Sequence, residues 1–566
     1  MAQPSLLNRE YFFYSLIILL ALALRFARLG GAPLNEFEAT AALPVLELAG
    51  GGQPALGGQP GYVLLTSLLF GLFGSSEFLA RFLPALFGLV LVVLPYFWRD
   101  LLGKKVALLL AFFLAIDPGL VAISRMAAGY MLALSVALMA LTAWRYGRPV
   151  LAGSIAALAL LSSPTVYFGV GAAVLVWLTL RLPIRVDKAA LRSSALAALV
   201  VVLLGGTLFF NVPQGLAGAG QALATFFFGT PNFPGSSLNL TLFALLGYSL
   251  PALIFGGFGA WRGWRLDETM GKALSLFAAY TFLLVLINPN RQVADLLWVL
   301  LPLWVLAAQV ASIFLHAPED EPVAAIGQAA LMLLLAAFLV PTLARLADTG
   351  FLLVPASDTL LPAISSHGMI ALFVLGIAGL ATALIALGWS RRAAAQGLVW
   401  ALALVFVLFL LSASSRFSRL ETAAANELLS PGPAAGQLGI LRETLADLSF
   451  WDQGQPAALP IELRSESAAL RWALRDYAQV SSSSAPPAVA ITTSEGQTPA
   501  EFAAYRGQSF ALSVQRAWES WPPNFFAWLL FRQAPTQSQQ LILWANTELF
   551  ADASLFDQSS AEDETP

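Results

Sequence analysis

Long apolar stretches fill this chain almost from its start to Ser412, and clusters of charge separate them. We count about thirteen such stretches, many of them near the ~18 residues that read as a membrane-crossing helix. The 566 residues are 58% hydrophobic and 11% charged, and the mean hydropathy is +0.75. No soluble domain of this size has that composition. The sequence therefore predicts an all-α polytopic membrane bundle.

The apolar runs also predict where the spans lie. The first, 11–29, follows Arg9 and has no small-residue cleavage site, so we interpret it as a retained signal anchor. The other predicted spans are 78–98, 105–117, 120–144, 149–162, 164–181, 193–211, 240–262, 272–287, 293–315, 323–345, 368–390 and 394–413. The shorter apolar segment 62–74 is expected to lie in the outer membrane interface. The Gly- and Pro-rich stretch 212–239 is expected to be an outer loop.

Lysine and arginine predict the orientation. They gather in connections that contain Arg99, Arg145, Lys188, Arg265 and Arg391. Loops rich in these residues stay on the cytoplasmic side of a membrane. A cytoplasmic N-terminus puts all of these connections on that side. We therefore predict a multi-pass protein of the plasma (cell inner) membrane, with loop 30–77 and the C-terminal part outside.

The composition changes after the last span. We predict a transmembrane module over 1–414, a small extracytoplasmic α/β domain over 415–556 and a disordered tail over 557–566. The predicted strands of this domain are 488–493, 510–515 and 541–546, and 462–478 is predicted to be helical. Trp518, Trp521, Trp528 and Trp544 pack in a core or stack on sugars.

Composition also excludes several functions. The chain has no cysteine and only two histidines, which excludes disulfides and a Cys- or His-built metal site. The net charge of −3 and the lack of a basic patch predict no nucleic-acid partner. Glu36, Glu38 and Asp117 are too scattered to indicate a divalent cation, so we predict no metal and no cofactor.

A few arginines remain on the predicted outer side. These are Arg25, Arg28, Arg81, Arg125, Arg291 and Arg345. One interpretation is that their side chains extend to the interface. The other is an anion site, because a planar guanidinium holds phosphate oxygens in a bidentate manner. We predict that Arg81, Arg125, Arg291 and Arg28 bind the phosphate of a lipid.

Glu36 and Glu38 lie in the first predicted outer loop, after Asn35. A carboxylate near a lipid interface can act as a general base, and we predict this role for one of the two. The alternative is structural: acidic residues are favoured in the first turn of a helix, and Asn35 is a good cap for one. Asp117, before Pro118, is predicted to cap a helix or to neutralise Arg125.

Several segments, in order along the chain, resemble the C-type glycosyltransferases (GT-C). This superfamily includes the protein O-mannosyltransferases and the lipid A aminoarabinose transferases. The carriers of the resemblance are RFARLGGAPLNEFEATAAL at 25–43, Arg81-x-x-Pro84-Ala85-x-x-Gly88, Ser124-Arg125, NPNRQVADLLWVLLPL at 288–303 and Trp472-Ala473-Leu474-Arg475-Asp476. The last is similar to a motif of a flippase-associated subgroup linked to surface glycosylation.

The resemblance implies a GT-C-like fold and a transferase that uses a polyprenyl-phosphate-linked sugar. The donor phosphate would lie on the outer arginines, and an outer-loop carboxylate would deprotonate a glycan, lipid or protein acceptor, with inversion at the sugar. No cofactor is implied. The chain departs from the family at Phe37, where the family has its catalytic Asp, and at Gly129, where it often has an acidic residue. These departures favour an alternative, a catalytically silent subunit that binds the lipid-phosphate sugar within a surface-glycan assembly or flippase complex.

Overall fold

The computed structural model describes residues 6–183, 187–228, 235–315, 322–349, 353–354, 363–419, 424–429, 432–480, 487–493, 503–519 and 521–550. The predicted tail 557–566 lies outside these ranges. The helices up to residue 419 are α1 (Leu6–Phe26), α2 (Glu36–Ala49), α3 (Pro60–Phe73), α4 (Glu77–Phe97), α5 (Arg99–Leu102), α6 (Lys104–Ile116), α7 (Pro118–Ser124), α8 (Tyr130–Arg145), α9 (Pro149–Ser162), α10 (Val166–Leu180), α11 (Lys188–Val200), α12 (Gln214–Phe228), α13 (Leu238–Arg265), α14 (Thr269–Ile287), α15 (Leu297–Ile313), α16 (Pro322–Thr349), α17 (Ser366–Gly388) and α18 (Arg391–Arg419).

Within the described residues, eight helices are long and apolar enough to cross a membrane, or nine if the bent pair α6 and α7 is one span. Further apolar helices of 10–17 residues, α3, α8, α9 and α10, accompany them. The chain is therefore a multi-pass membrane protein, as predicted. The exact number of spans, predicted as about thirteen, stays a prediction.

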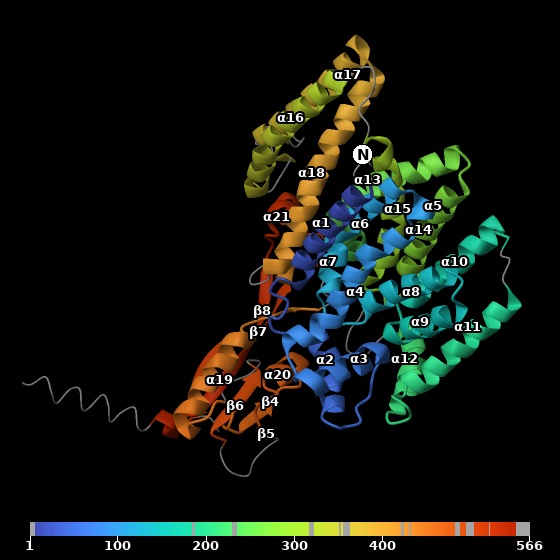
Figure 1. Ribbon diagram of the computed structural model, residues 1–566. Helices are drawn as coiled ribbons and strands as arrows, with labels where there is room; N and C mark the ends of the chain where they lie inside the picture. Colours follow the sequence, from blue (N-terminus) through green and yellow to red (C-terminus); the bar gives the residue numbers. More distant parts are fainter. Residues whose placement is uncertain are drawn as a thin grey trace, which may run out of the picture.

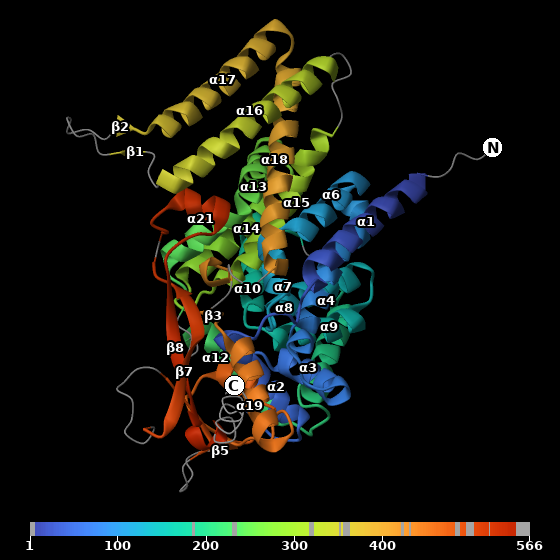
Figure 2. The ribbon, with the colours of Figure 1, turned by 90° about the vertical axis from the view of Figure 1, so that its left-hand side faces the viewer.

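The helices form one body with two extensions (Figure 1). α16 and α17 stand apart from the body at one end, where both pack against the long helix α18. α16 also contacts α21 (Phe525–Phe531) of the C-terminal part. The C-terminal sheet lies at the other end, beside α2. The first turns of α1 point away from the sheet in both views (Figure 2). The first loop and the C-terminal part are thus neighbours.

The C-terminal part contains a six-stranded mixed sheet with the order β3-β7-β8-β6-β4-β5. Its strands are β3 (Ala434–Ala435), β4 (Ile461–Arg464), β5 (Gln479–Val480), β6 (Val489–Thr493), β7 (Tyr505–Arg516) and β8 (Thr536–Asn546). β4 pairs in parallel with β5 and β6, and the other pairings are antiparallel. The helices are α19 (Leu438–Gln453), α20 (Ala468–Ala473) and α21 (Phe525–Phe531). A two-stranded pair, β1 (Leu353–Val354) with β2 (Ala363–Ile364), lies between α16 and α17.

The three predicted strands are confirmed as β6, β7 and β8. The predicted helix 462–478 is wrong in part: residues 461–464 form β4, and the helix α20 covers only 468–473. Sheet pairing overrides local helix preference here, because Ile461 and Glu462 are buried beside β6. The predicted boundary at 414 falls inside α18, and the division into domains stays a prediction.

Two predictions for the membrane part are wrong. The expected single helix 120–144 is broken between Ser124 and Tyr130 into α7 and α8. The expected outer loop 212–239 contains a helix of 15 residues, α12. Its aromatic side chain Phe226 packs against Tyr167 and Phe168, so tertiary contacts hold a helix that its glycines disfavour.

Three of the four tryptophans for which core packing or sugar stacking was predicted pack in cores. Trp518, Trp528 and Trp544 are each less than a tenth exposed, whereas Trp521 is half exposed. The Trp528 ring lies 4.5 Å from Phe243 of α13, and its Nε1–H donates to the Asn426 carbonyl. The tryptophan at 528 therefore fixes the C-terminal part to the bundle.

Candidate functional site

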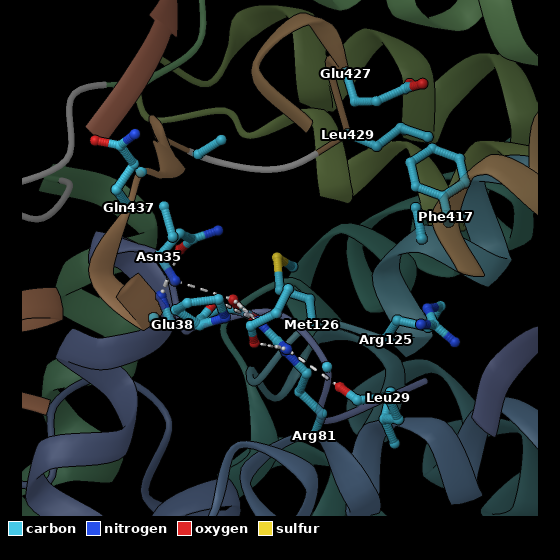
Figure 3. A pocket seen from close by; sticks show the side chains of 18 of the residues that line it. Leu29, Asn35, Glu38, Arg81, Arg125, Met126, Phe417, Glu427, Leu429 and Gln437 are labelled. Carbon is cyan, nitrogen blue, oxygen red and sulfur yellow. Dashed lines mark hydrogen bonds and ion pairs between the residues drawn. The ribbon is translucent and has the colours of Figure 1, made fainter. Parts of the chain in front are cut away.

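A cavity of about 360 Å³ lies where the first loop, the break after α7 and the C-terminal part meet (Figure 3). Its lining residues are Leu29, Gly31, Ala32, Pro33, Asn35, Glu38, Arg81, Ala122, Arg125, Met126, Phe417, Glu427, Leu429, Ala434, Ala435, Gly436, Gln437, Gly439 and Ile440. Three predicted site residues, Glu38, Arg81 and Arg125, come together here. Glu36, Arg28 and Arg291 are not in this lining.

Glu38 and Arg81 form a buried bidentate ion pair on one wall. Arg81 Nη2 lies 2.6 Å from Glu38 Oε2, and Arg81 Nε lies 2.8 Å from Oε1. The remaining donors of Arg81 go to the carbonyls of Leu29, Ala32 and Pro33. Arg81 therefore holds the loop after α1 in place, and its N–H groups are occupied by protein acceptors.

The Glu38 carboxylate is equally occupied. Besides Arg81, its oxygens accept from the backbone N–H of Ala127 at 3.0 Å and of Asn35 at 3.2 Å. Asn35 completes a capping box by accepting from the Glu38 N–H. Burial alone would raise the pKa of Glu38, but Arg81 and the two N–H donors outweigh it and hold this pKa below its ordinary value. Glu38 is thus an ionised carboxylate whose bonds are all to protein donors.

Arg125 also lines the cavity, but its guanidinium is only partly hydrogen-bonded to the protein. It is the residue after α7, and only 5% of its surface is exposed. Its Nη1 donates to the carbonyls of Leu24 and Arg25, at 3.1 and 2.9 Å, and so caps the end of α1. Nη2 makes no hydrogen bond in the described part of the chain, and Nε is buried without a partner. This guanidinium therefore keeps donors for a ligand.

The charges around the cavity leave Arg125 as the uncompensated one. Glu38 is paired with Arg81, and Glu427 is paired with Arg532 of the C-terminal part at 3.3 Å. Glu427 also accepts from the Tyr248 hydroxyl. Among the described residues no carboxylate lies within ion-pair distance of Arg125. A buried cation without a counter-ion favours an anionic ligand.

Glu36 lies on the other side of the α2 N-terminus. Its carboxylate accepts from the Ser467 hydroxyl and from the N–H groups of Ala468 and Ala469, at 2.7, 2.7 and 3.1 Å. It therefore caps α20 and joins the first loop to the C-terminal part. It lines a second cavity, of about 370 Å³, that shares Ala434 and Ala435 with the first.

The other predicted outer arginines have separate positions. Arg291 Nη1 caps the end of α14 through the carbonyls of Leu286 and Asn288. Arg25 is fully buried and caps α6 through Leu114 and Ala115, so it does not extend to the interface. Arg28 is exposed.

Asp117 caps α7 by accepting from the Leu120 N–H at 2.7 Å, and it also accepts from Trp304 Nε1 at 2.8 Å. The predicted cap is therefore confirmed. Glu36, Glu38 and Asp117 each bind different donors, and the described residues contain no group of three His, Cys, Asp or Glu side chains fit for a metal.

Phe37 and Gly129, the two positions that depart from the family pattern, each make defined contacts. Phe37 stacks against Tyr130 with ring centroids 6.3 Å apart. Gly129 is the cap residue before α8, and its N–H donates to Gln59 Oε1 at 2.7 Å. A Cβ at Gly129 would lie 1.9 Å from the Ser162 carbonyl oxygen, so this packing has no room for any side chain.

Gly129→Ala should therefore lower the free energy of unfolding by about 1–3 kcal/mol, because two backbone segments must separate. Thermal unfolding of the purified protein in detergent measures this. Gly220→Ala is the control, since a Cβ at this position in α12 meets no atom within 4 Å. Equal transition temperatures for Gly129→Ala and the wild type would contradict the close contact.

The Trp-x-Leu-Arg-Asp segment packs against the first loop. The Trp472 side chain is buried, and its ring lies 5.9 Å from Phe70 of α3. Arg475 Nη1 donates to Glu77 Oε1 at 3.2 Å, at the start of α4. These contacts attach the C-terminal part to the first loop.

Sequence reasoning missed the contribution of the C-terminal part to the cavity. Glu427, Leu429 and the segment 434–440 form one wall of it. In the sequence Glu427 is a single acidic residue between Asn426 and Leu428, and nothing local indicates that it is buried or that it pairs with Arg532. The start of α19 carries no motif.

The overall fold of the chain is similar to that of solved structures. No family model matches the sequence, and no curated protein does so. Among solved structures, ArnT from Cupriavidus metallidurans in the apo state matches with a TM-score of 0.52 and 18% identity, covering 83% of this chain and 86% of that one. The chain has an ArnT-like fold. The same protein bound to undecaprenyl phosphate matches with a TM-score of 0.51 and 18% identity, over 82% and 85% of the two chains.

This likeness confirms the GT-C-like fold class predicted from the sequence. The match covers more than four fifths of both chains. At 18% identity it is a likeness of fold. The chemistry has to be argued from the cavity.

Proposed function

We propose that this protein is an integral-membrane glycosyltransferase of the plasma membrane. It moves a sugar from a polyprenyl-phosphate donor to a glycan, lipid or protein acceptor on the extracytoplasmic side. The observation that carries this proposal is Arg125: a buried guanidinium without a counter-ion lines a cavity at the end of a membrane bundle. A lipid-linked phosphate supplies an anion at this place, and its lipid stays in the bilayer.

The likeness to ArnT supports the proposal, because that protein has been solved bound to undecaprenyl phosphate. The charges of the residues that line the cavity support the proposal as well. Glu38 and Glu427 are both neutralised by arginines, so neither repels a phosphate held by Arg125.

The proposed transfer is a single displacement. The acceptor oxygen attacks the anomeric carbon, and the bond from that carbon to the phosphate oxygen breaks. Polyprenyl phosphate leaves with the electron pair, and the configuration at the sugar inverts. The acceptor proton goes to a carboxylate. Arg125 stabilises the charge that grows on the departing phosphate.

Glu38 is the proposed base, because it lines the cavity and Glu36 does not. It must exchange one of its four donors for the acceptor hydroxyl before it takes the proton. Glu36 is proposed to join the first loop to α20 instead.

A second candidate is a catalytically silent subunit that binds the lipid-phosphate sugar. The occupied state of Glu38 favours it, as does Phe37 at the family's Asp position. In this role Arg125 binds the phosphate of the lipid, but no residue takes the proton of the acceptor hydroxyl.

A transfer assay separates the two. Purified protein in detergent is given polyprenyl-phosphate sugars and a panel of acceptors, and wild type, Glu38→Gln and Glu36→Gln are compared. We expect Glu38→Gln to lose at least about 100-fold in turnover, in line with loss of a general base, and to retain donor binding. We expect Glu36→Gln to keep most of its turnover. Donor binding without turnover in any form would support the silent subunit.

The proposed reaction uses no cofactor. Turnover should therefore be unchanged when EDTA is added to the same assay. A loss that Mg²⁺ or Mn²⁺ restores would add a metal ion to the proposed site.

A further inference from the structure

The segment 521–531 of the C-terminal part, which contains α21, is apolar and partly exposed. It carries several aromatic side chains and no charged one. Trp521 is 52% exposed, Phe525 39% and Phe531 46%. Large apolar side chains gathered on one exposed segment mark a contact with another protein or with a membrane. The neighbours of α21 distinguish these two kinds of partner.

α21 contacts the ends of two helices that are long and apolar enough to cross a membrane. Asn524, the cap residue before α21, donates a side-chain N–H to the carbonyl of Ala347, where the span of α16 ends. Arg416, in the last turn of α18, donates to the carbonyl of Leu530. Figure 2 shows α21 beside this end of α16.

The third contact of α21 is with the first turns of another span, α13. The ring of Phe243, in the second turn of α13, lies 4.7 Å from Trp521 and 6.0 Å from Phe525. The Trp528 ring packs so closely on Gly247 that a Cβ there would lie 2.8 Å from it. One span begins at α21 and two end there. The segment therefore lies at the height where these three spans leave the bilayer.

We infer that the segment 521–531 is a membrane-surface element, and that its partner is the phospholipid of the leaflet on the side of the C-terminal part. Lipid tails cover the apolar side chains of a helix that lies in a membrane interface, and tryptophan rings favour this depth. The adjoining span has the same kind of surface, because Leu246 and Leu250 of α13 are each more than two fifths exposed. The same lipid covers both.

This membrane contact is linked to the candidate site. Arg532, which follows α21 directly, donates from Nε to Glu427 Oε1 at 3.3 Å, and Glu427 lines the first cavity. The interfacial segment therefore fixes the height of this cavity wall relative to the bilayer. The inference about lipid contact does not depend on the proposed glycosyl transfer.

Spin labels at single cysteines test the inference, since the chain has no cysteine of its own. Phe525→Cys and Phe531→Cys place the label on α21. Phe450→Cys is the matched control, because Phe450 is 63% exposed on α19, which lies beside the sheet and away from α16 and α17 in both views (Figures 1 and 2). The full-length protein is reconstituted in bilayers of phosphatidylcholine and phosphatidylglycerol.

Electron paramagnetic resonance then measures how often each label collides with O₂, which enters lipid, and with a polar nickel chelate, which stays in water. We expect the ratio of O₂ to nickel collisions to be at least about tenfold higher for the two α21 labels than for the control, because apolar surroundings exclude a polar complex. Trp521→Cys repeats the measurement from outside the helix if a change within α21 prevents folding.

Each other outcome overturns the inference. A ratio equal to that of the Phe450→Cys control would show that water covers the segment. Low collision rates with both reagents would show that protein covers it, such as a second copy of this chain. Neither result bears on lipid-phosphate binding by Arg125, so the proposed function would stand.

Discussion

Glu38→Gln should lower the free energy of unfolding by about 3–5 kcal/mol, the usual cost of leaving one member of a buried ion pair without its partner. The variant keeps the shape of the side chain but leaves the Arg81 guanidinium buried beside a neutral amide. Two further bonds, from Ala127 and Asn35, are weakened at the same time. Thermal or denaturant unfolding in detergent measures the change.

Removing both charges is the informative control. Glu38→Gln combined with Arg81→Met should be less destabilising than Glu38→Gln alone, because no uncompensated charge stays buried. Glu36→Gln should cost about 1 kcal/mol, since it weakens hydrogen bonds to α20 that are partly solvated. If Glu38→Gln and Glu36→Gln unfold alike, the ion pair does not hold the first loop.

The ion pair between Glu38 and Arg81 makes the free energy of unfolding depend on pH. The pKa of Glu38 in the folded protein lies below the ordinary value of 4.5. Its contribution to stability is therefore complete above that value and is lost as the pH falls through the lower folded pKa. The stability difference between wild type and Glu38→Gln should be constant from neutral pH to about 4.5 and shrink only below it.

Arg125→Met should weaken binding of a polyprenyl phosphate by about 2–3 kcal/mol, roughly 30- to 150-fold, because it removes the charged donor with no partner in the protein. Binding is measured with the purified protein in detergent. Arg125→Lys should recover part of the loss, since it restores the charge without the planar fork.

Arg291→Met is the matched control for this prediction. Arg291 also caps a helix with two carbonyl contacts, but it lies outside the cavity lining. Its loss should cost stability and leave lipid-phosphate affinity within about twofold of the wild type. Unchanged affinity in Arg125→Met, or an equal loss in both variants, would remove Arg125 from the site.

Much of the fold follows from local pattern. The apolar runs at 78–98 and 272–287 differ from α4 and α14 by a few residues at most, since length and hydropathy are properties of the segment itself. The prediction fails where contacts with another segment determine the secondary structure. The break between α7 and α8 accommodates Gly129 against Ser162, and the short strand β4 exists because β6 lies beside it.

For the candidate site, the sequence predicted individual residues but not the contacts among them. The amino-acid pattern alone predicts a membrane protein and a group of arginines and two glutamates near its first loop, with Asn35 as a good cap for a helix that begins there. The three-dimensional contacts show which of these groups already have hydrogen-bond partners in the protein. Arg81 is occupied by Glu38 and by carbonyls of the loop after α1, whereas Arg125 keeps a free donor. The physical reason is that the acceptors, such as the Leu24 carbonyl for Arg125, come from segments about a hundred residues away.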